Sequence, residues 1–249
     1  MPTILITGCS SGFGLETAKL FLERGWKVFA TMRDPKADIL PASANLTVLP
    51  LDVTDPASIA RAIDQAGEID VLVNNAGFGA GAPVELTDLE TARRLFETNT
   101  LGTLAVMQAV LPAFRERSRG TIINVTSSVT LKPLPLVSVY RASKAAVNAL
   151  TESLAVEMEP FGVRVHMVLP GMSLETRFRE NAMPHFRGMD NLAYKPLIDG
   201  MMGRLQESTG PVTHAADVAE AVWHAATEPS APLKIPAGGD AVQWMAEAN

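Results

Sequence analysis

The stretch Thr3–Gly14, which reads TILITGCSSGFG, decides the fold of this chain. Its apolar run Ile4–Thr7 predicts a buried strand, and the glycines behind it predict a tight turn that opens a helix over Gly14–Arg24. Glycines allow the backbone to approach a pyrophosphate closely, and a helix N-terminus favours its negative charge. The spacing is GxxxGxG rather than the common GxGxxG, so the strand-turn-helix context carries the prediction of a nucleotide site.

The same alternation of strand and helix continues along the chain. Near-continuous Val, Ile and Leu runs predict strands that are covered on both faces, at Ile4–Thr7, Lys27–Thr31, Leu46–Leu51, Val71–Asn74, Thr121–Val125 and Arg164–Leu169. Longer segments predict helices at Gly14–Arg24, Pro56–Ala66, Asp88–Arg117, Val139–Glu159 and Ala215–Thr227. We therefore predict one doubly wound α/β (Rossmann) domain over residues 1–249, with a mainly parallel sheet of six to seven strands.

The segment Pro170–Pro211 differs from the rest, because it is rich in glycine, proline and methionine. It follows the sixth predicted strand, where long insertions often form lids or binding loops. We expect residues 170–211 to be a substrate lid; the alternative is an ordinary surface excursion. The residues that suggest an apolar cavity are Leu131, Leu134, Leu136, Met172, Phe178 and Phe186.

Composition excludes several classes of function. The net charge of −6 argues against nucleic acid, whose binding requires clustered Lys and Arg. The single Cys9 excludes an internal disulfide and fits a reducing compartment. We see neither a signal peptide nor an apolar run of about 18–20 residues that could span a membrane. We expect a cytoplasmic protein without a bound metal or a membrane partner.

Tyr140 and Lys144 stand four residues apart in the predicted helix Val139–Glu159, so they share one helix face. A cation beside a phenol favours the phenolate and lowers the tyrosine pKa from its ordinary value of about 10. That would suit a tyrosine which exchanges protons near neutral pH. The alternative is a solvated lysine beside a half-buried tyrosine.

Polar residues also follow the third and fourth predicted strands, where a doubly wound sheet binds its ligands. Asp52, followed by Val53, could accept a hydrogen bond from an adenine amino group, or it could cap the helix that begins at Pro56. Asn74, which opens the sequence Asn-Asn-Ala-Gly, could stabilise its own loop and support a cofactor at the same time.

Taken together, these motifs resemble the short-chain dehydrogenase/reductase family, in its compact branch of about this length. The resemblance covers Thr3 to about Gly171. It rests on Thr7-Gly8-x-x-x-Gly12-x-Gly14, Asp52-Val53, Asn74-Asn75-Ala76-Gly77, Asn99, Ser127, Tyr140-x-x-x-Lys144 and Pro170-Gly171, which occur in the family's order and approximate spacing. It implies hydride transfer between a substrate carbon and a nicotinamide cofactor.

The resemblance also implies roles for single residues. Tyr140 would be the general acid and base, and Lys144 would lower its pKa and bind the nicotinamide ribose. Ser127 would donate a hydrogen bond to the substrate oxygen, and Asn99 would hold a water that links Lys144 to solvent. The implied cofactor-binding residues are Gly8, Ser10, Ser11, Gly12, Phe13, Gly14, Arg33, Asp52, Val53, Asn75, Ala76, Gly77, Tyr140, Lys144, Pro170 and Gly171.

Two serines compete for the catalytic position. The family places its serine three residues after the strand asparagine and about thirteen before the tyrosine. Counting from Asn124 and from Tyr140 selects Ser127 and excludes Ser128. The glycine that often follows three residues later is replaced by Thr130, which could alter the loop before the substrate pocket.

The end of the second predicted strand indicates which nicotinamide is used. NAD-preferring members usually carry an acidic residue at the place that Met32 occupies here, with Arg33 next. An arginine can pair with a 2′-phosphate and stack on adenine. Asp34 comes one residue later and is expected to open the turn into Pro35. We therefore predict NADP(H) over NAD(H), with Ser11 as a further phosphate contact; the alternative for Arg33 is an exposed loop residue.

The overall pattern is similar to the branch near the 17β-hydroxysteroid and retinol dehydrogenases, which also contains bacterial reductases of unassigned substrate. This implies a hydrophobic ketone or alcohol as substrate and a homodimer or homotetramer that pairs the helices Asp88–Arg117 and Val139–Glu159. Thr176 stands six residues after Pro170 rather than the family's five, so its contact with the carboxamide stays open. The main alternative is a non-catalytic nucleotide-sensing regulator; an epimerase of the longer branch and a flavodoxin-like module fit less well.

Overall fold

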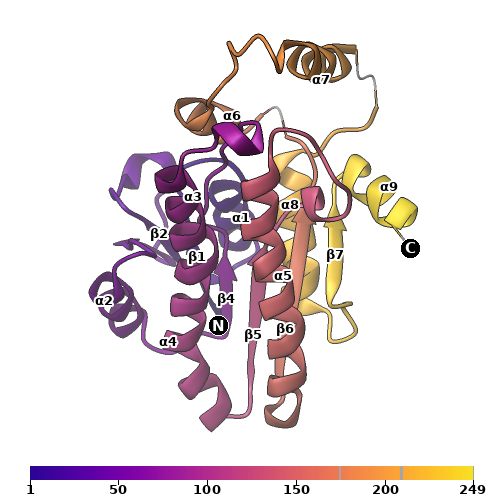
Figure 1. The fold of residues 1–249 in the computed structure, drawn as a ribbon. Coiled ribbons are helices and arrows are strands. Elements are labelled where there is room, and N and C mark those ends of the chain that lie inside the picture. Colours follow the sequence, from indigo (N-terminus) through magenta and orange to yellow (C-terminus); the bar gives the residue numbers. More distant parts are fainter. Residues whose placement is uncertain (174, 208–209, 249) are drawn as a thin grey trace.

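The computed structural model describes residues 1–173, 175–207 and 210–248, and within them one sheet of seven strands forms the centre of the molecule (Figure 1). The strands are β1 (Thr3–Thr7), β2 (Lys27–Met32), β3 (Leu46–Pro50), β4 (Val71–Asn74), β5 (Gly120–Val125), β6 (Val163–Pro170) and β7 (Lys234–Ala237). Each neighbouring pair is parallel, in the order β3-β2-β1-β4-β5-β6-β7. The predicted doubly wound domain is confirmed, and the predicted strand ends differ from these by at most one residue.

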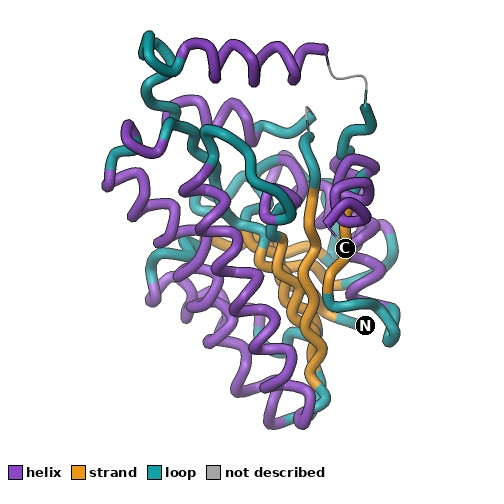
Figure 2. The backbone as a smooth tube through the Cα atoms, turned by 45° about the vertical axis from the view of Figure 1, so that its right-hand side comes forward, coloured by secondary structure: helices purple, strands orange, loops and turns teal. Residues whose placement is uncertain are grey.

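Alternation along each strand sends side chains to two cores, one on each face of the sheet. Ile4 and Ile6 of β1 pack toward α1 (Gly12–Glu23) and α8 (Ala215–Thr227). Leu5 packs on the other face. That second core includes residues of α2 (Pro56–Ala66), α4 (Gly102–Glu116) and α5 (Ser138–Met158). Figure 2 shows the strands enclosed between the helices, which explains why their sequences are apolar throughout.

The order of the strands fixes where a ligand can bind. After β1 the chain builds outward through β2 and β3, and then returns to place β4 on the other side of β1. The carboxyl ends of β1 and β4 therefore lie next to each other at the point where the strand order reverses. Open α/β sheets bind ligands outside this point.

The predicted helix Asp88–Arg117 is not one regular helix, and this part of the sequence prediction is wrong. It consists of α3 (Leu89–Phe96), a π-helical turn at Glu97–Leu101, and α4. Asp88 is the N-cap of α3, because its Oδ1 accepts a hydrogen bond of 2.7 Å from the backbone N–H of Thr91. A π turn accommodates one extra residue within a helix and often lies at a functional site. Asn99 lies in this turn.

The segment after β6 rises above the carboxyl ends of the strands, as Figure 1 shows for α7. It contains α6 (Phe178–Ala182), a 3₁₀ turn at Met183–His185, and α7 (Lys195–Glu207). The chain then enters α8 and ends in α9 (Gly239–Ala248). We call residues 172–213 the lid; the predicted lid, residues 170–211, began two residues earlier, where Pro170 is still part of β6. Within the described ranges, no helix is long and apolar enough to cross a membrane.

Candidate active site

A cleft with a volume of about 710 Å³ opens at the carboxyl ends of β1 to β5, beneath the lid. Most of the predicted cofactor residues line it: Gly8, Ser10, Ser11, Gly12, Phe13, Arg33, Asp52, Val53, Asn75, Ala76, Gly77, Tyr140 and Lys144. Among the described residues, Gly14, Pro170 and Gly171 were predicted to contact the cofactor but do not line this cleft. The volume falls in the range of pockets that hold small molecules and cofactors.

The glycine-rich turn is held in place by the end of β4. Gly8 has φ of 76°, and a Cβ atom there would lie 2.8 Å from the Cα of Ala76. The side-chain amide of Asn75 donates to the carbonyls of Thr7, at 2.9 Å, and Gly8, at 3.1 Å. Gly14 faces inward, since a Cβ atom there would lie 2.5 Å from both Asn75 Nδ2 and Gly8 O. The close packing at Gly14 therefore explains why it does not line the cleft.

The N-terminus of α1 has the features of a phosphate site. Ser11 is the N-cap, its side chain makes no capping hydrogen bond, and the first turn of α1 contains no acidic residue. Thr176 of the lid packs against Gly12, where a Cβ atom would lie 3.2 Å from Thr176 Cβ. The buried Thr176 Oγ1 has no hydrogen-bond partner among the described residues. Open backbone donors, a helix dipole and an unsatisfied hydroxyl together fit the diphosphate of a dinucleotide.

Basic side chains surround the other end of the cleft. Arg33, which is exposed, and Lys36 both line it after β2, whereas Asp34 is not among the lining residues described. Asp52 accepts hydrogen bonds at Oδ1 from the backbone N–H and the hydroxyl of Thr54, at 2.9 and 2.7 Å. The alternative role for Asp52 is wrong, because the cap of α2 is Asp55, whose Oδ1 accepts from the backbone N–H of Ala57 at 2.9 Å.

Tyr140 and Lys144 lie on one face of α5, with exposures of only 8% and 6%. Burial raises the pKa of Tyr140 to about 12, and a hydrogen bond with the Ser127 side chain opposes part of that rise. Burial also lowers the pKa of Lys144 to about 8, and its Nζ donates to the carbonyl of Val125 at 3.0 Å. The expected lowering of the tyrosine pKa is therefore wrong for this structure. Desolvation outweighs the neighbouring cation, whose charge is itself disfavoured by burial.

Thr130 stabilises the loop that contains Ser127. Ser127 is the N-cap of the 3₁₀ turn Ser128–Thr130, and its Oγ accepts from the backbone N–H of Val129 at 3.3 Å. The hydroxyl of Thr130 donates to the carbonyl of Ser127 at 2.8 Å and accepts from the amide of Asn148 at 3.0 Å. The threonine that replaces the family's glycine thus ties the serine's backbone to α5.

Asn99 is fully buried, and it holds the loop that follows β4. Its Oδ1 accepts from the backbone N–H of Phe78, and its Nδ2 donates to the carbonyl of Phe78, both at 3.0 Å. The same Nδ2 donates to Ser143 Oγ of α5 at 3.1 Å. The side-chain amide is therefore occupied by protein groups, so its direct contribution is to fix the position of the loop at Gly77 and Phe78.

Aromatic residues of the lid reach the catalytic end of the cleft. The ring of Phe178 lies 5.7 Å from that of Tyr140. It fits there because Gly79 has no side chain: a Cβ atom would lie 2.7 Å from Phe178 Cζ. His185 lies 4.9 Å from the ring of Phe78. Of the six residues predicted to form an apolar cavity, only Phe178 is among the described residues that line this cleft.

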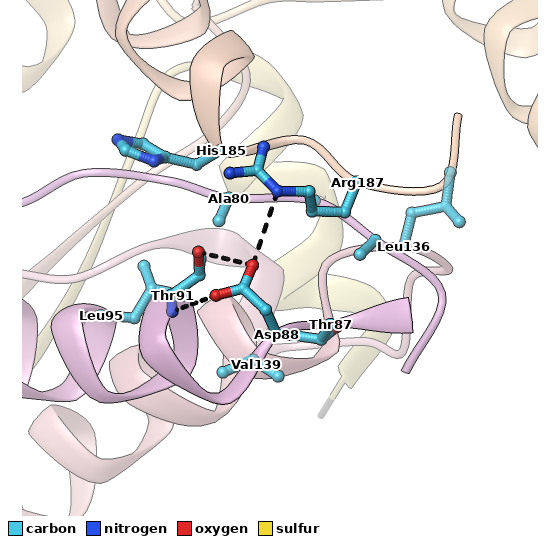
Figure 3. Close-up of a pocket in the computed structure, with 11 residues that line it drawn as sticks. Ala80, Thr87, Asp88, Thr91, Leu95, Leu136, Val139, His185 and Arg187 are labelled. Atoms are coloured by element: carbon cyan, nitrogen blue, oxygen red, sulfur yellow. Dashed lines mark hydrogen bonds and ion pairs between the residues drawn. The ribbon is translucent and has the colours of Figure 1, made fainter. Parts of the chain in front are cut away.

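A second, much smaller pocket of about 10 Å³, the size of one water, lies where the lid meets α3 (Figure 3). Asp88 is at its centre and accepts from the hydroxyl of Thr91 at 2.9 Å, while Arg187 of the lid lies 3.6 Å from Asp88 Oδ2. Leu136 lines this pocket rather than the large cleft. The pocket is therefore a contact between the lid and the body, too small for a substrate.

Sequence reasoning missed several residues that line the large cleft. Those near the catalytic end are Phe78, Arg94, Glu97, Thr98, Asn181 and His185. Arg94 places its guanidinium 5.7 Å from the centre of the Phe78 ring. Arg94, Glu97 and Thr98 stand at i, i+3 and i+4 in a predicted helix, a spacing that could have indicated them. The lid residues have no sequence pattern that places them.

A family model and several known proteins match most of this chain. The family model described as short chain dehydrogenase matches residues 2–185. An uncharacterized oxidoreductase of Schizosaccharomyces pombe is 38% identical, over 86% of this chain and 92% of its own. The 3-ketodihydrosphingosine reductase of Bacteroides thetaiotaomicron is 40% identical, over 72% of this chain and 66% of its own. Bovine retinol dehydrogenase 8 is also 40% identical, over 68% of this chain and 58% of its own.

Solved structures resemble the whole molecule. A short-chain dehydrogenase from Streptomyces avermitilis superimposes with a TM-score of 0.86, at 32% identity, and covers 99% of this chain and 91% of its own. A serine dehydrogenase complexed with NADP+ gives a TM-score of 0.81 at 29% identity, covering 96% and 95%. A 3-ketoacyl-(acyl-carrier-protein) reductase from Brucella melitensis, complexed with NADH, gives 0.76 at 26% identity, covering 94% and 96%.

Proposed function

The chain belongs to the short-chain dehydrogenase family of oxidoreductases, and we propose that it transfers a hydride between NADP(H) and the carbonyl or alcohol carbon of a largely apolar substrate. The observation that carries this proposal is the buried pair of Tyr140 and Lys144 in the large cleft, with Ser127 hydrogen-bonded to the phenol. When bound, the nicotinamide supplies the hydride donor or acceptor. The protein's own residues position the substrate and move the proton.

In the reductive direction Tyr140 is the general acid. Its phenol gives its proton to the substrate oxygen as the carbonyl carbon gains a hydride, so that the products are an alcohol and a phenolate. Ser127 donates a hydrogen bond to the same oxygen as negative charge develops there. Burial raises the pKa of Tyr140, so the phenol carries at neutral pH the proton that it transfers. Lys144, buried beside it, stabilises the phenolate that remains.

The apolar character of the substrate is supported by the walls at the catalytic end. Phe78 and Phe178 both line the cleft there, one from the loop after β4 and the other from the lid. Two relatives named for hydrophobic compounds, the 3-ketodihydrosphingosine reductase and the retinol dehydrogenase, are consistent with a long or ring-containing apolar carbonyl. We further propose a homodimer or homotetramer, since apolar side chains are exposed at Leu101 just before α4, at Val156 of α5 and at Phe161 just after α5.

The direct test is a substrate panel with purified protein. Hydrophobic ketones and their matched alcohols are offered with NADPH or NADP+, beside small polar carbonyls of the same reactivity, and NADPH absorbance is followed. We expect turnover of the hydrophobic members and a much lower kcat/KM for the polar ones. Tight NADPH binding without turnover of any member would instead indicate a binding protein on this fold.

The preference for NADP(H) is tested by reversing one charge. Arg33→Asp is expected to lower kcat/KM with NADPH by about 100-fold, equivalent to about 2.7 kcal/mol, because a phosphate loses a charge-assisted partner and meets a carboxylate. Efficiency with NADH should fall far less. The matched control is Arg115→Asp, an exposed arginine near the end of α4, which should leave both values unchanged. An unaltered NADPH-to-NADH ratio in Arg33→Asp would count against the proposed selectivity.

A further inference from the structure

The two ends of the lid meet at one buried carboxylate. Asp240, in the first turn of α9, is only 8% exposed. Its Oδ2 accepts a hydrogen bond of 2.6 Å from the backbone N–H of Met172, where the lid begins. Its Oδ1 accepts a hydrogen bond of 2.6 Å from the hydroxyl of Thr213, where the lid ends. The backbone N–H of Thr213 also donates to the carbonyl of Met172 at 3.0 Å.

Two glycines allow the backbone to pack closely around Asp240 and its partner Thr213. A Cβ atom on Gly171 would collide with both carboxylate oxygens of Asp240, so only glycine lets the carboxylate lie against the turn after β6. Gly238 has φ of 94°, and a Cβ atom there would collide with Thr213 Oγ1. Thr213 itself is 1% exposed and accepts a hydrogen bond of 3.0 Å from the backbone N–H of Gly171. Two glycines and a buried threonine thus surround the carboxylate.

The C-terminal end of α9 contacts the loop that carries Ser127. Lys132, two residues after the turn that begins at Ser128, places its Nζ 4.1 Å from the centre of the Trp244 ring and 3.3 Å from Glu247 Oε2. Helix α9 therefore contacts both the base of the lid and the loop that carries Ser127.

The lid also contacts the body through a backbone hydrogen bond of 2.9 Å from Arg187 N–H to the carbonyl of Gly81, and through two side-chain pairs that are more exposed than Asp240. Arg187 pairs with Asp88, and the hydrogen bond between His214 and Glu175 raises the pKa of His214 and lowers that of Glu175. All four of these side chains are more than two-fifths exposed, so water competes for them. Hydrogen bonds to a buried charged group are stronger, and losing the carboxylate would leave Met172 N–H without its acceptor.

We infer that Asp240 is a positioning residue for the proposed reaction, which fixes both ends of the lid so that Phe178 is held against Tyr140. This inference rests on the proposed function for its kinetic part only. Asp240 would act indirectly, because it is not among the described residues that line the cleft. Its hydrogen bonds to Met172 and Thr213 determine where the lid leaves the body and where it returns. A change far from the chemistry that misplaces the reacting groups by about 1 Å can lower the rate by about 100-fold.

The test compares Asp240→Asn and Asp240→Ala with the wild-type protein. We expect Asp240→Ala to lower kcat/KM for the carbonyl substrate by at least about tenfold, mainly through a raised KM. The Kd of NADPH should change by less than about threefold, because Gly8, Ser11 and Gly12 belong to the body, and the lid adds Thr176 beside Gly12. Asp240→Asn keeps one acceptor oxygen and should recover part of the loss.

The control is Asp55→Ala, which removes the N-cap of α2 and destabilises the fold away from the lid. Hydrogen exchange supplies a readout that does not depend on turnover. Amides of the lid should exchange faster in Asp240→Ala but not in Asp55→Ala. Equal kcat/KM in Asp240→Ala and wild type, or unchanged exchange in the lid, would overturn the inference. If the wild-type protein reduces no carbonyl, the proposed function fails while the exchange experiment still decides the role of Asp240.

Discussion

Tyr140→Phe is expected to lower kcat by about 10³-fold while NADPH still binds, because general acid catalysis contributes about 10²–10⁴-fold. The substitution removes only the hydroxyl. The phenyl ring keeps its buried position and its contact with Phe178, whose ring centre lies 5.7 Å away. Binding and folding should therefore persist, and the loss should fall on the proton-transfer step. Steady-state kinetics and NADPH fluorescence measure the two quantities separately.

The chain provides a matched control, since it has two tyrosines. Tyr194 lies in the lid, and its hydrogen bond to Glu85 raises its pKa. Tyr194→Phe removes the same atom from a site outside the large cleft and should retain most of the activity. Turnover in Tyr140→Phe at the wild-type rate would refute the assignment of the general acid.

Lys144→Met is expected to lower kcat by at least about 10²-fold and, at the same time, to make the protein more stable at neutral pH. Burial lowers the pKa of Lys144 from 10.5 to about 8, which corresponds to a cost of about 3 kcal/mol for keeping the ammonium charged in the folded state. Methionine has a similar stem and no charge. Loss of the hydrogen bond to the carbonyl of Val125 offsets about 1 kcal/mol, so we expect a net gain of about 2 kcal/mol.

The sign of the pH dependence follows from that lowered pKa. Between about pH 8 and pH 10.5 the unfolded state binds more protons at Lys144 than the folded state, so the stability of the wild-type protein rises with pH. The advantage of Lys144→Met is therefore full below about pH 8 and shrinks above it. Denaturant unfolding at about pH 7 and about pH 9.5 measures this change.

Lys19→Met serves as the control for this experiment, because Lys19 is partly exposed and forms a surface ion pair with Glu16. It should show no comparable dependence on pH. A Lys144→Met protein that is less stable than wild type at neutral pH, or an advantage that grows with pH, would contradict the expectation.

The sequence was sufficient to predict β1 to β6, because each of these strands has an apolar local composition. Strands such as Val71–Asn74 are buried on both faces, so they are visible in the sequence as continuous apolar runs. The exception is β7: its four residues, Lys-Ile-Pro-Ala, include a proline and are too short for a pattern. The π turn at Glu97–Leu101 was missed because apolar residues recur at helical spacing on each side of it, and the local pattern on either side does not show that an extra residue lies between them.

For the candidate site, too, the sequence predicted local properties and missed those that depend on distant parts of the chain. Motif spacing placed Tyr140 and Lys144 on one face of α5, which is a property of the helix alone. It could not give the direction of the tyrosine pKa, because desolvation depends on what the rest of the chain packs around the phenol. The lid contacts of Phe178 and the bonds of Asp240 likewise join segments far apart in the chain, so no local signal encodes them.

The π turn also bears on how such a chain can change over generations. Leu95 before the turn and Val106 after it are both buried, so the flanking helices already present their core faces correctly. A single-codon deletion within the turn would restore a regular helix without rotating either face. A protein with this deletion would keep the fold and lose the hydrogen bonds between the Asn99 side chain and the backbone of Phe78.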